Sequence, residues 1–264
     1  MKKNIFVLTS LMLTLGCGCD SFLDETNYSD VTSEGGYYDT EAGLNAVVNA
    51  CYTPLRFWAG KEDAIGLSET GTDIIAAGSG CVDNNMAAYT QSLDGTNSAC
   101  TFYFDRFYAA INWCNTAIFH AQTVPNPSND EILATTLNKR EAEARVLRTF
   151  YYWILTETFG DTYYTDQPST SIVMNPVKTS TDNIYQYMFD DLDWAIKSKL
   201  STLQNDGGRV TIWTAKALKA RLLLTRASEK NDVDMYGQAY DLAKDVIENG
   251  PFELAEDFAS IWDM

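Results

Sequence analysis

The chain has 264 residues, of which 45% are apolar and 12% aromatic, and 36 acidic residues against 19 basic ones give a formal charge of −17. This apolar content supports a sizeable core and excludes an intrinsically disordered chain. The carboxylate excess argues against nucleic-acid binding, which depends on Lys and Arg, and the single histidine, His120, leaves too few imidazoles for most catalytic triads and zinc sites.

The N-terminus has the pattern of an export signal. Lys2 and Lys3 precede an apolar run over residues 5–15, which is too short to span a bilayer, and Gly16-Cys17-Gly18-Cys19 follows it. Small residues directly before a cysteine are typical of the lipobox of bacterial lipoproteins, where the cysteine is acylated and the chain is cut before it. We expect a lipoprotein signal peptide over residues 1–18 and a lipid anchor at Cys17 or Cys19, of which Cys17 has the better upstream context.

Four further cysteines follow the signal. Cys81 and Cys100 lie in a stretch rich in Gly, Asn and Ser, where a disulfide would close a loop in an oxidising compartment. Cys51 and Cys114 fall within helical patterns and are predicted to be small buried residues.

The first half of the chain predicts a tether, a helix and a long loop. Residues 19–38 are polar and contain Gly35-Gly36, which is typical of a tether. Apolar residues from Leu44 to Trp58 then recur at helical spacing and predict one amphipathic helix. Residues 59–100 show no sustained period, and long loops on a helical scaffold usually carry function.

Two helices are predicted in the middle of the chain. One runs through Phe104 and Ile118 and stops before Pro125. The next begins at Ser128-Asn129-Asp130-Glu131, which has the spacing of a capping box, and stops at Gly160. A loop over residues 161–181 follows.

Three shorter helices complete the chain. Residues 182–200 form one, Thr211 caps another, and a third starts at Asp234, buries Ala239, Leu242, Ala243 and Val246, and ends at Gly250-Pro251. Helices with almost no alternating strand pattern predict an all-α protein, either a TPR-like α-solenoid of antiparallel helix pairs with long irregular loops or a plain bundle.

No sequence motif indicates an enzyme, a metal site or a cofactor. The chain has no P-loop, GxGxxG, HExxH or paired CxxC. Carboxylates such as Asp190-Asp191 and the Glu141/Glu143 pair are interpreted as solvated helix-face residues rather than catalysts. We predict no catalytic residues, no metal ligands and no cofactor.

Several short segments occur in a specific order along the chain. They are Cys19-Asp20-Ser21-Phe22-Leu23-Asp24, Phe104-x3-Tyr108-x2-Ile111-x3-Asn115, Glu141-Ala142-x2-Arg145-x-Leu147-Arg148-x2-Tyr151, Phe159-Gly160-Asp161, Asp191-Leu192-x2-Ala195, Gly208-Arg209-Val210-Thr211, and Ala239 through Val246-Ile247-x2-Gly250. This order resembles the SusD/RagB family of nutrient-binding outer-membrane lipoproteins. Together these segments cover nearly the whole chain after the signal.

The resemblance implies a fold, a location and partners. It implies TPR-like helical pairs held by lipid on the outer face of the outer membrane, where the protein covers a SusC-like TonB-dependent transporter and captures glycans or, in some members, peptides. It also places the lipidated cysteine at Cys19, against the local preference for Cys17.

The chain departs from the family pattern in two places. Phe104 stands where the helix motif usually opens with Trp, which keeps an aromatic side chain. The family also continues beyond this length, so residues 39–264 resemble its N-terminal helical domain without the C-terminal part.

The ligand-binding candidates come from the long irregular segment. Sugars are bound by flat aromatic rings, with amides or carboxylates on the hydroxyls. Tyr89 with Asn84, Asn85 and Gln91 supplies such a group, and Trp58 supplies a second aromatic platform, although a tryptophan on an apolar helix face is more often core. Trp153, Trp194, Trp213 and His120 are interpreted as packing or surface residues.

The leading hypothesis is therefore a lipid-anchored surface protein that binds an oligosaccharide or polysaccharide and delivers it to a SusC-like transporter. A TPR-type scaffold or adhesin that binds protein partners is an alternative from another class, because a fold does not determine a function. A surface glycosidase is a third.

Overall fold

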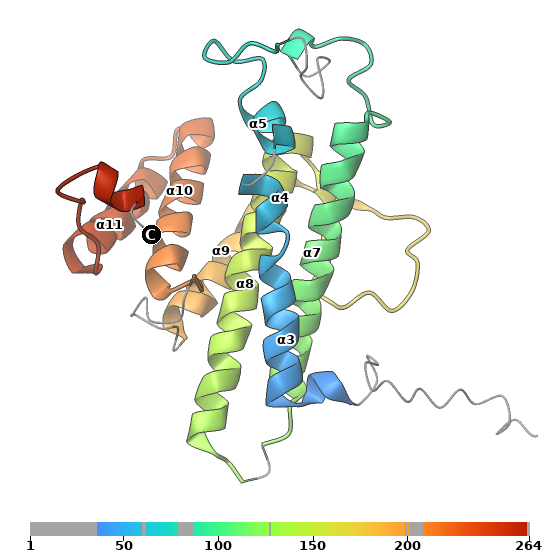
Figure 1. Ribbon diagram of the computed structural model, residues 1–264. Helices are drawn as coiled ribbons and strands as arrows, with labels where there is room; N and C mark the ends of the chain where they lie inside the picture. Colours follow the sequence, from blue (N-terminus) through green and yellow to red (C-terminus); the bar gives the residue numbers. More distant parts are fainter. Residues whose placement is uncertain are drawn as a thin grey trace, which may run out of the picture. The chain divides into compact units, whose positions relative to one another are not determined.

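A computed structural model describes residues 36–59, 62–78, 87–126, 128–198, 200 and 208–262, which are mostly helical (Figure 1). The elements are, in order, η1 (Tyr37–Asp39), α3 (Glu41–Tyr52), α4 (Leu55–Ala59), α5 (Glu62–Ser68), α7 (Ser98–Thr123), α8 (Glu131–Phe159), β1 (Thr162–Tyr163), β2 (Lys178–Thr179), α9 (Thr181–Lys197), α10 (Ile212–Lys230), α11 (Val233–Asn249) and η2 (Ala259–Trp262). The described α-helices all belong to the unit formed by residues 38–264.

Several predictions concern positions outside the described residues. These are the signal peptide, the lipidation candidates Cys17 and Cys19, the tether up to residue 35, Cys81, Asn84 and Asn85. The Cys81–Cys100 pairing therefore stays a prediction.

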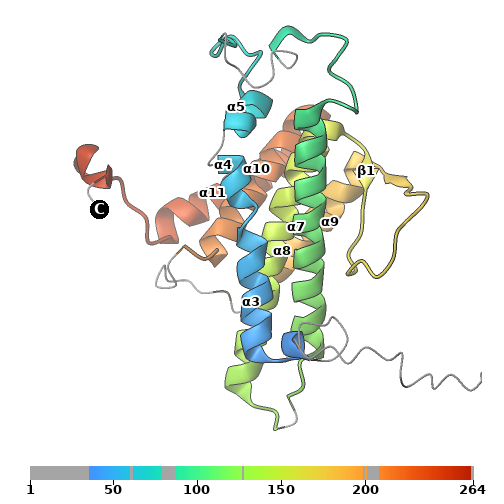
Figure 2. The same ribbon diagram turned by 45° about the vertical axis from the view of Figure 1, so that its right-hand side comes forward.

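The long helices α7 and α8 lie side by side and run in opposite directions (Figures 1 and 2). Asn97 caps α7 by accepting hydrogen bonds from the amides of Ala99 and Cys100. Asp130 caps α8 in the same way, so the predicted capping box led by Ser128 is wrong by two residues. Gly160 ends α8 with φ 69°, a conformation that glycine tolerates best.

The single helix predicted over Leu44 to Trp58 is broken in the structure. α3 ends at Tyr52, and α4 begins at Leu55. Pro54 explains the break, because it has no amide hydrogen for the helical ladder. The amide of Thr53 bonds to the carbonyl of Ala50, three residues back, which tightens the last turn of α3.

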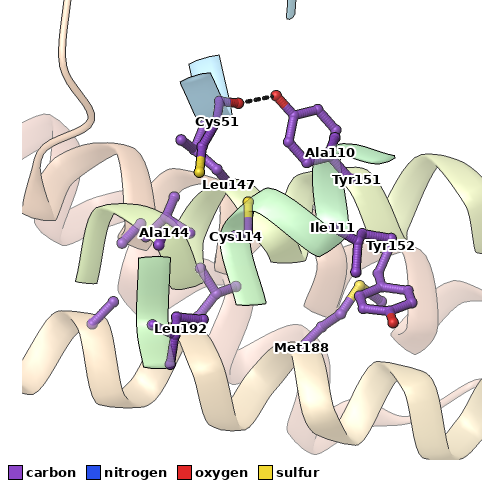
Figure 3. Close-up of a cluster of buried hydrophobic side chains, with 14 of the residues drawn as sticks. Cys51, Ala110, Ile111, Cys114, Ala144, Leu147, Tyr151, Tyr152, Met188 and Leu192 are labelled. Carbon is purple, nitrogen blue, oxygen red and sulfur yellow. Dashed lines mark hydrogen bonds between the residues drawn. The ribbon is translucent and has the colours of Figure 1, made fainter. Parts of the chain in front are cut away.

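The core lies where α3, α7, α8 and α9 meet. Figure 3 shows Cys51, Cys114, Leu147 and Leu192, one from each of these helices, packed together. Cys51 and Cys114 are both fully buried, which confirms their prediction as small core residues. The hydroxyl of Tyr151 donates to the carbonyl of Cys51 at 2.6 Å and so ties α8 to the end of α3.

Each later helix packs against the one before it in the chain. α9 packs against α8, α10 against α9, and α11 against α10. Thr211 caps α10 as predicted, and a capping box with Thr214 completes that helix start. This sequential stacking confirms the all-α, solenoid-like architecture.

The predicted buried face of α11 is mostly wrong. Ala239 is buried, but Leu242 and Val246 are half-buried and Ala243 is exposed. The reason is that the helix packs chiefly against α10 and leaves its remaining surface uncovered.

The predicted loop over residues 161–181 contains two short strands. β1 and β2 pair antiparallel, with Thr162 opposite Thr179 and Tyr163 opposite Lys178. Strands of two residues are too short to show an alternating pattern.

Within the described ranges, no helix combines the length and apolar character needed to cross a membrane.

Candidate functional site

An open cleft of about 570 Å³ lies where α4, α5, the segment after it, the start of α7 and the end of α8 meet. Its aromatic lining is Trp58, Tyr89, Trp153 and Phe159. Its aliphatic lining is Leu67, Leu93 and Ile154, and its polar lining is Ser68, Thr70, Cys100, Glu157 and Thr158. We call this site the aromatic cleft. Its volume falls in the usual range of small-ligand sites.

Trp58 enters the aromatic cleft from α4. Its ring meets the edge of Tyr103 at a centroid distance of 6.1 Å and lies 6.0 Å from the ring of Phe107, both in α7. These contacts hold the indole against the core while one side lines the cleft. Trp58 therefore packs against the core and also lines the cleft, while its role as a platform for a sugar stays a prediction.

Tyr89 reaches the aromatic cleft from the long loop. Its side chain is 73% exposed, and its backbone has φ 47°. A bulky residue in the left-handed region is an outlier that costs about 1–2 kcal/mol, and such outliers cluster at functional sites. The structure thus brings Tyr89 and Trp58 to one cleft, whereas Gln91 is exposed and does not line it.

The segment leading into α7 is held by local hydrogen bonds. Asp94 accepts from the amide of Thr96 at 2.8 Å and from its hydroxyl at 2.7 Å. These bonds lower the pKa of Asp94. Together with the Asn97 cap, they position Leu93 and Cys100 at the wall of the cleft.

The C-terminal end of α8 supplies residues that sequence reasoning missed. Trp153, interpreted as packing, and Glu157 and Phe159 all line the aromatic cleft. The guanidinium of Arg221 lies 4.8 Å from the Trp153 ring centroid, while the indole Nε1 is buried and has no hydrogen-bond partner within the described part of the chain.

Glu157 is the acidic group of the aromatic cleft. Its Oε1 accepts a hydrogen bond of 2.5 Å from the hydroxyl of Tyr185 in α9. Burial, followed by this hydrogen bond, raises the pKa of Tyr185, so the phenol stays protonated and donates. The carboxylate is thereby oriented, and its other oxygen is available to accept from a ligand hydroxyl.

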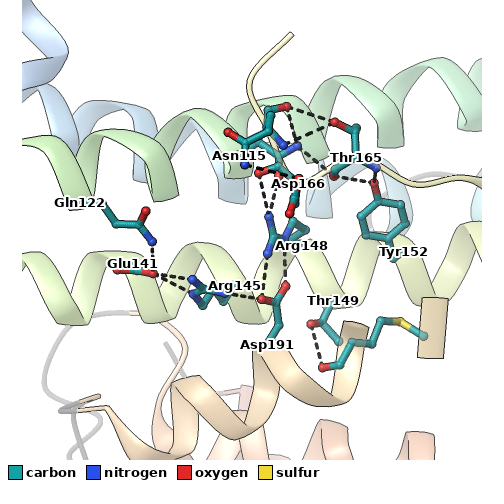
Figure 4. A network of polar contacts seen from close by, with 12 residues as sticks. Asn115, Gln122, Glu141, Arg145, Arg148, Thr149, Tyr152, Thr165, Asp166 and Asp191 are labelled. Carbon is teal, nitrogen blue, oxygen red and sulfur yellow. Dashed lines mark hydrogen bonds and ion pairs between the residues drawn. The ribbon is translucent and has the colours of Figure 1, made fainter. Parts of the chain in front are cut away.

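A buried polar network supports the helices beneath the site (Figure 4). Arg148 in α8 donates to both carboxylate oxygens of Asp191 in α9, each at 2.8 Å, and Arg145 donates to the same carboxylate at 2.6 Å. Burial alone would lower the pKa of Arg148, but the Asp191 carboxylate raises it, so the guanidinium stays charged.

The same network holds the chain that follows α8. Asn115 in α7 accepts from Arg148 at 2.8 Å and donates to the carbonyls of Thr165 and Gln167 at 3.1 and 3.0 Å. The Tyr152 hydroxyl both donates to the Thr165 carbonyl and accepts from its amide. Segment 164–169 is therefore fastened to α7 and α8.

Three carboxylates predicted to be solvated are buried. Glu141 and Asp191 are each 5% exposed and Glu143 is 3% exposed, which overturns that prediction, whereas Asp190 is exposed as expected. Each buried carboxylate is paired with at least one arginine, because an unpaired buried charge would be costly. Glu141 bonds Arg145 one helical turn away.

Three other residues that the sequence assigned to packing or the surface, namely His120, Trp194 and Trp213, pack within the fold. The Nδ1 atom of His120, which is 3% exposed, lies 2.8 Å from a carboxylate oxygen of Asp39. Trp194 carries the Arg145 guanidinium 4.7 Å from its ring centroid, and Trp213 is buried. No group of three or more potential metal ligands occurs in the part of the chain described above.

An apolar groove of about 460 Å³ adjoins the aromatic cleft and shares Trp153 with it. Leu55, Phe150, Val210, Leu218 and Arg221 are among its lining residues. Because this lining has few hydrogen-bonding groups, the groove is less suited to a polyhydroxylated ligand than the aromatic cleft, which combines rings with a carboxylate and hydroxyls.

Comparisons with known proteins support the resemblance. A SusD-like family model, described as starch-binding and associating with the outer membrane, matches residues 72–261, well over half of the chain. A SusD-like protein of Bacteroides ovatus is 26% identical over 99% of this chain and 47% of its own length. The chain spans about half the length of the curated relatives it matches.

Solved structures share the fold. A SusD homologue from Bacteroides thetaiotaomicron superposes with a TM-score of 0.72 at 20% identity, covering 90% of this chain and 45% of its own. A structure with a xylogluco-oligosaccharide gives 0.66 at 22% identity, over 83% of this chain and 42% of its own. A laminarin-binding SusD-like protein gives 0.61 at 19% identity, over 83% and 47%.

Proposed function

We propose the function of this chain from one premise: it belongs to the SusD-like family, whose members are described as starch-binding and associating with the outer membrane. In our proposal the chain binds glycans without cleaving them, and it does so in the aromatic cleft. The relatives that carry a xylogluco-oligosaccharide or bind laminarin support a glycan as the ligand class.

The observation that carries the proposal is the meeting of Trp58, Tyr89 and Trp153 around one cleft that also holds a carboxylate and hydroxyls. Sugar rings present C–H faces that pack against aromatic rings, and hydroxyls that need hydrogen-bond partners. The aromatic cleft offers both kinds of contact within a few side chains of each other.

The proposal extends to where the protein is located and to the transporter with which it works. The export signal, with Cys17 or Cys19 as the acylated residue, supports a lipid anchor at the outer-membrane surface. Family membership supports a SusC-like TonB-dependent transporter as the protein that receives the glycan. Mass spectrometry of the N-terminus and co-purification from membranes test these two points separately.

A binding panel tests the central claim. Maltoheptaose, laminarihexaose and a xyloglucan oligosaccharide are titrated into the purified protein by calorimetry, with Tyr89→Ala as the test variant and Tyr240→Ala, a tyrosine in α11 that is 65% exposed, as the control. Loss of one aromatic platform costs on the order of 1.4 kcal/mol, so Tyr89→Ala should weaken binding about tenfold and the control should not.

Other outcomes favour other functions. Full affinity in Tyr89→Ala would remove the aromatic cleft as the site. Absence of glycan binding together with a stable protein partner would favour the scaffold, and release of reducing ends from a polysaccharide would favour a glycosidase.

A further inference from the structure

We infer that the aromatic cleft selects uncharged glycans and disfavours glycans that carry carboxylates or sulfates, with Glu157 as the residue that determines this selectivity. The inference rests on the proposed function and names the ligand class of that site. It follows from the charges that line the cleft.

Glu157 carries the negative charge of the cleft wall. It projects from the last turn of α8, on the same helix face as Trp153 four residues earlier, and both side chains line the cleft. The Tyr185 hydroxyl holds one carboxylate oxygen at 2.5 Å, and Tyr185 itself is 2% exposed, so the anchor is rigid. Glu157 itself is exposed, so a ligand in the cleft meets a solvent-accessible carboxylate that Tyr185 orients.

Among the described residues, the arginines nearest the cleft are engaged by aromatic rings or carboxylates. The described lining of the cleft contains no Lys or Arg. Arg106 lies over the rings of Phe57 and Phe102, at 4.8 and 5.2 Å from their centroids. Arg221 lines the neighbouring apolar groove and lies 4.8 Å from the ring centroid of Trp153, and Arg226, which lies over the Tyr185 ring, is paired with Asp182 and Glu229. The excess of 36 acidic over 19 basic residues adds a long-range repulsion for anions.

The two ligand classes meet the carboxylate differently. A neutral sugar donates a hydroxyl hydrogen to Glu157, and a hydrogen bond to an ionised acceptor is stronger than one between neutral groups. A sugar carboxylate has no such hydrogen and adds like-charge repulsion. For two unit charges about 4 Å apart in a water-like medium, this repulsion corresponds to about a fivefold loss of affinity.

A matched pair of probes tests the selectivity. Maltoheptaose and laminarihexaose are compared with the same oligosaccharides after oxidation of their primary hydroxyls to carboxylates, which keeps the chain and its linkages. The neutral form should bind at least about fivefold more tightly at low ionic strength, and the difference should narrow as salt screens the charges.

Two variants assign the effect to one residue. Glu157→Gln removes the charge and keeps an oxygen that accepts from Tyr185, so the difference between the probes should fall to about twofold or less. Glu131→Gln removes one charge from the opposite end of α8, about 39 Å away at 1.5 Å per residue, and should leave the difference unchanged.

The outcomes separate the inference from the proposed function. Equal affinity for neutral and oxidised probes, or an undiminished difference in Glu157→Gln, would overturn the selectivity while the glycan-binding function stands. Failure of both neutral probes to bind would overturn the proposed function and the inference with it.

Discussion

Asp191 offers the clearest test of how the buried ion pairs stabilise the fold, because its carboxylate neutralises the buried guanidinium of Arg148. The side chains of Arg148 and Asp191 are 4% and 7% exposed, and Arg148 donates two hydrogen bonds to the carboxylate. Asp191→Asn keeps the shape of the side chain but removes the charge. Arg148 then retains Asn115 as its neutral side-chain partner, so a buried cation is left without a counter-ion.

The expected loss is large on the scale of a folded domain. Removing one partner of a buried ion pair costs about 3–5 kcal/mol, against a total stability of roughly 5–15 kcal/mol. At about 2–4 °C per kcal/mol for a chain of this size, the midpoint of thermal unfolding should fall by roughly 10 °C. Circular dichroism during heating, with urea unfolding as a second measurement, gives both quantities.

Asp193 provides a matched control on the same helix. It pairs with Lys219 at 2.5 Å, but its side chain is 45% exposed. An exposed pair contributes less than about 1 kcal/mol, so Asp193→Asn should lower the midpoint by a few degrees at most. Equal losses in Asp191→Asn and Asp193→Asn would refute the reasoning from burial.

Two further measurements test the fold. Burial raises the pKa of Tyr151 and Tyr152 above their ordinary value of 10.0, so the folded chain retains protons that the unfolded chain releases. Stability should be complete below pH 10 and fall above it, and the share of the tyrosinate absorbance that belongs to these two residues should appear only as helicity is lost. Gly160→Ala should cost about 1–3 kcal/mol because of its φ of 69°, although nothing lies within 4 Å of the added carbon, whereas Gly237→Ala inside α11 should stabilise by about 0.5–1 kcal/mol; equal effects in urea unfolding would contradict this.

The sequence predicted the longer helices well because their apolar residues keep a helical period over several turns. It missed α5 within the segment 59–100, because a helix of 7 residues is too short to show a sustained period. It failed where one residue interrupts the ladder, as at Pro54, and where the elements are too short to have a period, as in β1 and β2. The burial of α11 was also mispredicted. An apolar stripe shows which face of a helix is suited to packing, but not whether a neighbouring element covers it.

Only part of the aromatic cleft was predicted, because its lining residues are far apart in the sequence. Tyr89 and Trp58 were found because they belong to, or border, a long irregular segment. Trp153 and Glu157 lie far along the chain within a regular helix, where an aromatic residue is normally core. The sequence did show that Trp153 and Glu157 are four residues apart, and so share a helix face, near the helix end at Gly160. This spacing indicates a site only when the end of α8 is known to lie beside α4 and the loop.

The residues that carry the family resemblance and those that line the cleft are largely different sets. Asn115, Arg148 and Asp191 belong to the shared segments, and the structure uses them to join α7, α8 and α9. Trp153 and Glu157 follow Arg148 by five and nine positions on the same helix but take no part in that network. Side chains at the cleft can therefore change with little effect on the buried ion pairs, which allows the lining of the cleft to vary on a constant helical scaffold.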